Sequence, residues 1–212
     1  MLKVAAALVA GVVAMGGWAV VTVKDLPEYF VAGQQYTIEF QVRQHGRTLL
    51  SGLRPQLVID SPGAREVVIP AVARSAEGTY AVTFTAPLPA AGEVRFTIRS
   101  GFMNNELRLY AQPVIAAGTS RPAMAARDRG QMLFVAKGCN TCHSNIDLAD
   151  RPDNQLVTVG PELGGRHLAR EYVVQKVKNP ASEKMPDLGL TDAEANAIAA
   201  LLNGERGALS GR

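Results

Sequence analysis

The sequence contains few of the residues that build covalent or metal-rich sites. Among 212 residues there are two cysteines, three histidines and one tryptophan. Two cysteines are too few for a disulfide scaffold or a four-cysteine metal site. Lys and Arg number 22 against 19 Asp and Glu, and this net charge of +3 is too small and too dispersed for a nucleic-acid-binding protein. Because 47% of the residues are hydrophobic, the composition also excludes a disordered chain.

The N-terminal region lacks charge. Residues 4–23 contain no charged side chain, and a helix of this length could span a bilayer as an anchor. Alternatively, residues 1–19 form a signal peptide that ends in the small-x-small site Gly17-Trp18-Ala19, so that the mature chain begins near Val20. The short apolar region is rich in Ala and Gly, which favours cleavage over anchoring. Both interpretations predict an exported, periplasmic or extracytoplasmic protein.

Residues 20–115 alternate between apolar and polar side chains. Ile38, Phe40 and Val42 fall on one face of a predicted strand, and residues 80–85 and 94–99 repeat the pattern. Glycine and proline separate about seven such strands. This spacing over about 100 residues predicts an N-terminal all-β domain, an antiparallel sandwich of the immunoglobulin-like type, which needs no cysteine.

The pattern becomes helical in the C-terminal part. Residues 116–124 are small, polar and broken by Gly and Pro, and they predict a linker. Helices are predicted over residues 125–137 and 167–178 and from Thr191, where Glu194 completes a capping box. Residues 144–166 lack periodicity, and such a stretch in a compact domain normally wraps around something. We therefore predict an all-α domain over residues 125–205, followed by a tail over residues 206–212.

Both cysteines lie in the motif Cys139-Asn140-Thr141-Cys142-His143. The spacing places the two sulfur atoms one helical turn apart, as two thioether bonds to the vinyl groups of haem require. The histidine that follows would then lie under the iron as its proximal ligand. This string is the attachment signature of c-type haem.

Two other interpretations of the motif are weaker. A redox-active cysteine pair is typical of a helix N-terminus in a βαβ unit, whereas this motif follows a helix in an all-α segment. A zinc site would need two more nitrogen or sulfur ligands, and only His167 is near in sequence.

A sixth ligand to the iron is expected from a loop further along the chain. Met185 stands in a polar segment directly before Pro186, where a methionine is poorly placed to fill a core. A thioether sulfur paired with histidine raises the reduction potential and closes the iron to other ligands. His167 is the rival ligand, but it stands at the predicted start of a helix, where a capping or surface role is more common.

Residues 125–205 resemble a class I monohaem cytochrome c domain. Gly130, Phe134 and Gly138 match the first helix of that family, Gly160-Pro161-Glu162-Leu163 resembles its G-P-x-L loop, and Met185-Pro186 resembles its axial-methionine loop. Leu190-Thr191-Asp192-Ala193-Glu194 resembles the start of its last helix. The resemblance covers about 80 of 212 residues.

The resemblance implies a site that holds one covalent haem c. Cys139 and Cys142 would carry the haem, and His143 and Met185 would bind the iron. The Pro161 carbonyl would accept the imidazole N–H of His143. Further packing against the haem would come from four residues, Phe134, Gly160, Leu163 and Pro186. One departure is Leu201, which stands where the family carries an aromatic residue packed on the first-helix glycine, and this predicts a looser helix pair.

The predicted function is single-electron transfer between a donor and an acceptor redox protein, because histidine and methionine leave the iron no open position. The protein would then be an electron carrier rather than an enzyme, with the β-domain as a docking module, either free or as a subunit of a membrane redox complex. Two alternatives remain. A haem enzyme or gas sensor would need an exchangeable sixth ligand. Delivery of copper through the β-domain would use soft ligands such as His45 and Met103.

Overall fold

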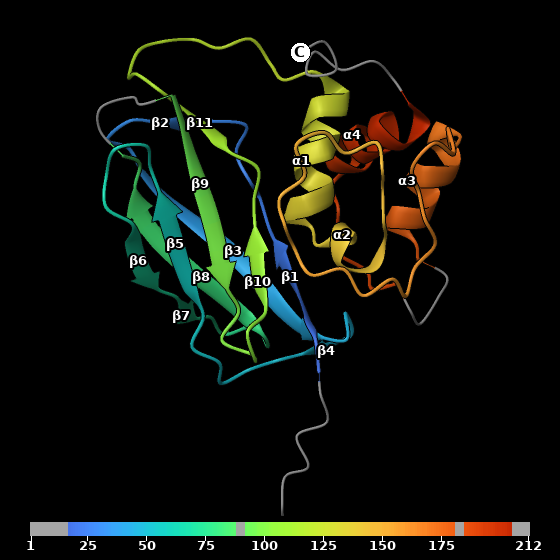
Figure 1. The fold of residues 1–212 in the computed structure, drawn as a ribbon, viewed down its shortest axis with the longest axis horizontal. Helices are drawn as coiled ribbons and strands as arrows, with labels where there is room; N and C mark the ends of the chain where they lie inside the picture. Colours follow the sequence, from blue (N-terminus) through green and yellow to red (C-terminus); the bar gives the residue numbers. More distant parts are fainter. Residues whose placement is uncertain (1–16, 88–91, 181–184, 205–212) are drawn as a thin grey trace, which may run out of the picture.

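The computed structural model describes residues 17–87, 92–180 and 185–204. Figure 1 shows two domains side by side: a β-sandwich formed by the first half of the chain and a smaller group of helices formed by the second half. β1 and β10 are the strands of the sandwich that lie nearest to the helices. The predicted fold class, an all-β sandwich followed by an all-α domain, is confirmed.

The first sheet has the order β1-β3-β8-β7, and β4 pairs with one end of β3. All of its pairings are antiparallel, and β1 is a terminal strand. The bounds are Ala19–Val23 for β1, Gln35–Gln44 for β3, Thr48–Leu49 for β4, Val72–Ala73 for β7 and Thr79–Thr85 for β8.

The second sheet has the order β2-β11-β9-β5-β6, and β10 also pairs with β9. The pairing of β2 with β11 is parallel and brings Phe30 beside Val114. The bounds are Phe30–Val31 for β2, Gln56–Asp60 for β5, Val67–Pro70 for β6, Gly92–Arg99 for β9, Glu106–Arg108 for β10 and Gln112–Ile115 for β11.

The core of the sandwich follows the predicted alternation. Ile38, Phe40 and Val42 of β3 are buried between the sheets, whereas Thr37 on the other face is exposed. Arg43 breaks the pattern, because it too is buried, on the outer face of its sheet. Aromatic rings fill the centre of the core, where Phe30, Phe84 and Phe96 pack at tilted angles with centroids 5.1–5.6 Å apart.

The helical domain contains α1 (Ala126–Ala136), the single turn α2 (Cys139–Cys142), α3 (Arg170–Lys178) and α4 (Asp192–Asn203). The predicted capping box is present, because the Thr191 hydroxyl accepts from the Glu194 N–H and the Glu194 carboxylate accepts from the Thr191 N–H. Residues 144–166 form neither helix nor strand, as their lack of periodicity predicts.

Two details of the helices differ from prediction. α3 begins at Arg170 rather than at His167, because His167 has φ +46° and a left-handed residue cannot continue a right-handed helix. The expected looseness around Leu201 is also absent. A Cβ on Gly130 would lie 2.0 Å from the carbonyl oxygen of Ala197, so α1 and α4 touch backbone to backbone with Leu201 buried beside them.

α1 joins the two domains. Leu133 and Phe134 pack into the helical core, while Val135 and Ala136 belong to the core cluster of the sandwich. Gly138, which follows the helix with φ +77°, lies directly against β1: a Cβ there would come within 2.5 Å of Val20 Cγ1. The domains therefore share apolar packing at their boundary.

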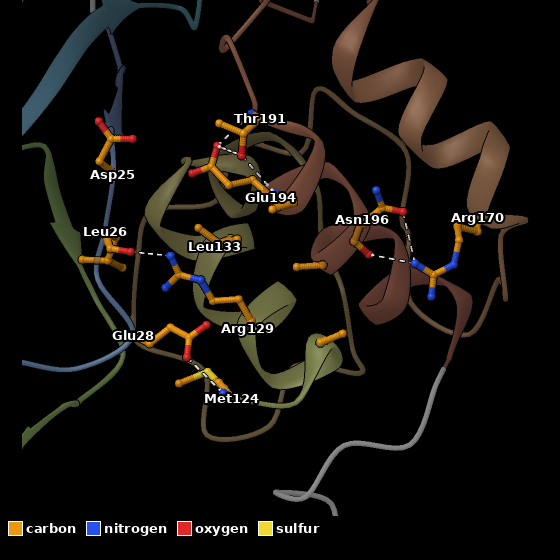
Figure 2. Close-up of a pocket in the computed structure, with 13 residues that line it drawn as sticks. Asp25, Leu26, Glu28, Met124, Arg129, Leu133, Arg170, Thr191, Glu194 and Asn196 are labelled. Carbon is orange, nitrogen blue, oxygen red and sulfur yellow. Dashed lines mark hydrogen bonds between the residues drawn. The ribbon is translucent and has the colours of Figure 1, made fainter. Parts of the chain in front are cut away.

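Charged side chains also cross this boundary. Figure 2 shows Arg129 of α1 donating to the carbonyl of Leu26, which lies in the connection between β1 and β2. Glu28 in that connection accepts from the backbone N–H of Met124 at 3.0 Å. These contacts line a cavity of about 540 Å³ between the connection and helices α1 and α4.

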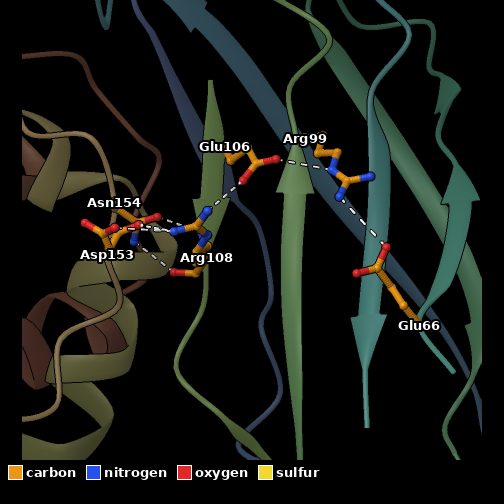
Figure 3. Close-up of polar contacts among 6 residues, drawn as sticks. All are labelled: Glu66, Arg99, Glu106, Arg108, Asp153 and Asn154. Atoms are coloured by element: carbon orange, nitrogen blue, oxygen red, sulfur yellow. Dashed lines mark hydrogen bonds and ion pairs between the residues drawn. The ribbon is translucent and has the colours of Figure 1, made fainter. Parts of the chain in front are cut away.

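A third set of contacts ties the irregular segment 144–166 to the sandwich. Asn154 and Arg108 of β10 exchange two hydrogen bonds, at 2.7 and 2.9 Å, through the amide of Asn154 and the backbone of Arg108. Figure 3 shows Arg108 within a row of alternating charges that runs from Asp153 through Arg108, Glu106 and Arg99 to Glu66. The Tyr110 hydroxyl also donates to the Ala149 carbonyl at 2.9 Å.

The predicted export segment lies mostly outside the described residues. Of its last residues, Trp18 packs its ring against His45, and its carbonyl accepts from the His45 N–H at 2.9 Å. Ala19 is the first residue of β1. Within the described residues, no helix is both long enough and apolar enough to cross a membrane.

We predict that Gly138→Ala destabilises the protein more than Gly52→Ala does. Both glycines have a left-handed φ, +77° and +73°, so each alanine incurs about 1–2 kcal/mol of backbone strain. The alanine side chain at 138 would in addition overlap β1, and such overpacking costs about 1–3 kcal/mol. The alanine side chain at 52 would have no atom within 4 Å. Urea unfolding of both variants measures the difference, and equal losses would contradict the close approach.

A second prediction concerns the buried ion pair between Lys137 and Glu194, whose Nζ and Oε1 atoms are 2.6 Å apart. Burial alone would raise the pKa of Glu194, but hydrogen bonds from Lys137 and Thr191 outweigh it and hold that pKa below its ordinary value. A carboxyl with a lowered folded pKa stabilises the fold above its unfolded pKa and loses that effect as the pH falls.

Glu194→Gln should therefore cost about 3 kcal/mol at neutral pH, because Lys137 is left buried without its partner. The difference in free energy of unfolding between this variant and the unmodified protein should become smaller as the pH falls below about 4.5, the ordinary pKa of this carboxyl. Unfolding midpoints across that range test both statements. Glu171→Gln is the matched control, since Glu171 is an exposed acidic residue in the first turn of α3. A gap that stays constant with pH would contradict the assignment.

Candidate haem site

The motif that carries both cysteines forms one helical turn between two abrupt changes of backbone direction. Gly138 is the left-handed residue before α2, and His143 leaves the turn in an extended conformation with φ −114°. The His143 N–H donates to the Cys139 carbonyl at 2.9 Å, which closes the turn. Cys139 and Cys142 are not joined in a disulfide.

Burial makes both thiols weak acids. It raises the pKa of Cys139 to about 12 and also raises that of Cys142. A redox-active cysteine pair needs a thiol pKa below the ordinary value, so that a thiolate is present to attack. The environment of this motif therefore opposes the redox interpretation.

A loop from further along the chain holds the His143 ring. Nδ1 of His143 lies 2.9 Å from the carbonyl oxygen of Pro161, the contact that the family resemblance implies. With Nδ1–H donating to Pro161, Nε2 is the nitrogen that remains to bind a metal. Gly160 lies flat against the ring, since a Cβ there would be 2.4 Å from Cε1 of His143.

Backbone hydrogen bonds hold this loop against α2. The N–H groups of Val157, Gly160 and Leu163 donate to the carbonyls of Thr141, Cys142 and Ser144 at 2.8–2.9 Å. This explains part of the irregular segment 144–166: Val157 and Gly160 bond to carbonyls of the motif, and Leu163 bonds to Ser144 directly after it. The wrapping that its lack of periodicity predicts is centred on the cysteine turn.

The structure gathers several predicted site residues in one apolar cluster. Phe134 is fully buried in it, and Cys139, Leu163 and Met185 are partly buried members. Pro186 is half-buried beside Met185. The segment immediately before Met185, residues 181–184, lies outside the described residues. Histidine, paired cysteines and a thioether facing an apolar cluster are the donor set that a c-type haem requires, so the residues present fit this group.

His167 is occupied elsewhere. Its Nδ1 lies 3.2 Å from the carbonyl oxygen of Asn203, the last residue of α4, and its ring packs over Gly204. The side chain therefore caps the C-terminal end of that helix, where carbonyl groups lack partners within the helix.

The arrangement of the described residues does not support the zinc or the copper interpretation. Over 17–87, 92–180 and 185–204, no group of three or more His, Cys, Asp or Glu side chains is placed to hold a metal ion. In the β-domain, the His45 ring packs at a tilted angle against Trp18, and the Met103 sulfur accepts from the Gly17 N–H at 3.4 Å.

Sequence reasoning missed three exposed apolar side chains around the motif. Ile146 is 80% exposed just after His143, and Leu156 and Val159 are exposed in the loop before Gly160. Their exposure could not be read from sequence, because apolar residues in an aperiodic segment give no sign of which way they face.

We predict that Gly160→Ala disturbs the iron ligand, whereas Gly165→Ala in the same loop does not. The new methyl group at 160 would overlap the His143 ring, while a Cβ at 165 has no atom within 4 Å. Relieving such an overlap costs about 1–3 kcal/mol, which corresponds to a shift of about fivefold to about a hundredfold away from the ligated ring position. The low-spin absorption spectrum of the haem-loaded protein measures this. Identical spectra for the two variants would contradict the role of Gly160.

Comparison with known proteins identifies a family for the C-terminal domain. Residues 125–202 match the sequence model of the family described as cytochrome C oxidase, cbb3-type, subunit III. No curated protein matches the chain. Among solved structures, the Lin-41 filamin domain is similar at 19% sequence identity and a TM-score of 0.30, over 49% of this chain and 86% of that domain. The C-terminal region of the chain, residues 125–202, is a c-type cytochrome domain.

Proposed function

We propose that this protein is an exported electron carrier with a single haem c, bound through Cys139 and Cys142 and ligated by His143 and Met185. The observation that carries the proposal is the hydrogen-bond geometry of His143: Pro161 fixes Nδ1 at 2.9 Å and leaves Nε2 for the iron. Met185 and Cys139 pack against the same apolar cluster, and this shared packing supports the proposal that Met185 supplies a thioether ligand.

The residues of the site have separate tasks. When bound, haem supplies a reversible one-electron iron couple. The Pro161 carbonyl keeps the imidazole in one tautomer and one orientation, and Gly160 allows the loop to lie against the ring. Phe134 and Leu163 keep water away from the centre. Met185 would be the second protein ligand of the iron, and a fully ligated iron would restrict the chemistry to electron transfer.

The family description names a subunit of an oxidase, and this guides the proposal for partners. We propose that electrons pass between a donor and an acceptor redox protein, within a membrane redox complex, and that the β-domain positions the haem domain there. The tight boundary between the domains supports this role, because a module that positions another must be rigidly attached to it.

Export is part of the proposal, with residues 1–19 as a cleaved signal or as a retained anchor. The expected anchor helix over residues 4–23 cannot extend to residue 23, because Ala19–Val23 form strand β1. Trp18 and Ala19 make backbone contacts with His45 and Asn105, which cleavage before Val20 would remove. The N-terminal mass of the mature protein distinguishes the two forms.

Met185→Ala tests the electron-carrier assignment. We expect it to abolish the far-red absorption band that ferric haem shows with a thioether ligand, to lower the reduction potential and to let the ferrous protein bind carbon monoxide rapidly. Met103→Ala is the control, because Met103 is 55% exposed in the β-domain, and it should leave all three properties unchanged. Rapid carbon monoxide binding by the unmodified protein would contradict the assignment and favour a haem enzyme or gas sensor.

A further inference from the structure

The boundary between the domains contains a cavity of about 410 Å³ beside the loop that carries Met185. The β-domain contributes Lys24, Gln41 and Arg43 to its wall. The haem domain contributes Lys137, Glu194 and Asp187, and Asp187 is the second residue after Met185. Charged groups of the sandwich therefore face the segment that bears the proposed sixth ligand.

Two of the three cations in this wall already have carboxylate partners. Lys24 pairs with Glu39 and Lys137 pairs with Glu194, each at 2.6 Å. Arg43 is held differently. Its guanidinium donates to Oε1 of Gln41 at 2.6 Å and to the Thr22 hydroxyl at 3.4 Å, and only 8% of the residue is exposed.

The Asp187 carboxylate is the countercharge that Arg43 faces across the cavity. Burial lowers the pKa of the Arg43 guanidinium, and the negative charge of Asp187 acts in the opposite direction. Asp187 also accepts from the Gly189 N–H at 2.8 Å, so its carboxylate belongs to the turn that follows Met185. An interaction that holds the Asp187 carboxylate in place therefore also restrains this turn.

The same residues connect to the other side of the haem site. The Thr22 hydroxyl, which accepts from Arg43, donates to the Lys137 carbonyl at 3.3 Å. Lys137 directly precedes Gly138 and the cysteine turn, where β1 makes its close approach. Hydrogen bonds thus run from Lys137 through Thr22 to Arg43, and Arg43 faces Asp187 of the Met185 loop across the cavity.

We propose that the β-domain clamps the axial-ligand loop, with Arg43 as the positioning residue that holds the turn after Met185 closed over the site. This rests on the proposed ligation by Met185. A loop ligand is bound for the fraction of time that its segment is closed, and an interaction made only in the closed state raises that fraction. The sandwich then contributes directly to haem chemistry, beyond attaching the domain to a partner.

The test uses the full-length, haem-loaded protein and the variant Arg43→Gln. We expect the far-red thioether band to weaken, because the positive charge that attracts Asp187 is lost. The rate of carbon monoxide binding to the ferrous protein should rise about tenfold. Arg43→Lys keeps the charge and should restore most of the band. Lys24→Gln is the control: it removes a positive charge from the same cavity wall, but Lys24 pairs with Glu39 rather than with Asp187. It should leave both the far-red band and the carbon monoxide rate unchanged.

A double-mutant cycle with Asp187→Asn separates the clamp from general damage to the fold. If Arg43 acts through Asp187, the double variant should bind carbon monoxide no faster than Arg43→Gln alone. Additive effects, or an unchanged band in Arg43→Gln, would overturn the clamp. If the unmodified protein lacks the far-red band, the Met185 assignment itself fails, so the two failures are distinguishable.

Discussion

Helix α1 packs against two hydrophobic cores at once, one in each domain, and the remaining architecture depends on this constraint. Leu133 and Phe134 face the helical core, while Val135 and Ala136 face the sandwich. A helix buried on two sides cannot keep a broad polar face, and its few charged groups must find partners. Arg129 does so at the Leu26 carbonyl, and Lys137, directly after the helix, does so at Glu194. The position of the cysteine turn follows, because it begins where this doubly packed helix ends.

Three glycines mark the close approaches on which the haem domain is built, each with a different neighbour. Gly130 meets the backbone of α4, Gly138 meets β1, and Gly160 meets the ring of His143. At each point the missing Cβ sets a distance that no other residue permits. The arrangement fixes the motif from three directions: from the last helix, from the sandwich and from its own following loop.

Features encoded over short stretches of sequence could be predicted. The alternation in β3, the capping box at Thr191 and the cysteine motif each depend on neighbours within a few residues. The burial of Arg43 could not be predicted, because an arginine in an alternating strand is indistinguishable from a solvent-exposed one until the second domain covers it. The same holds for Lys137. The helical pattern around His167 predicts that this residue belongs to a helix. Its left-handed backbone and its contact with Asn203, 36 positions away, leave no trace in the local sequence.

The place of β1 at the end of its sheet has a consequence for solubility. A terminal strand presents unpaired backbone groups, which other chains can extend by adding a strand of their own. Here the helical domain covers that side of β1: the Val21 carbonyl faces Gly138, and Thr22 bonds to Lys137. The haem domain therefore protects the edge of the sheet at β1 from pairing with another chain. Any defect that keeps this domain from docking would expose the β-domain to edge-to-edge association.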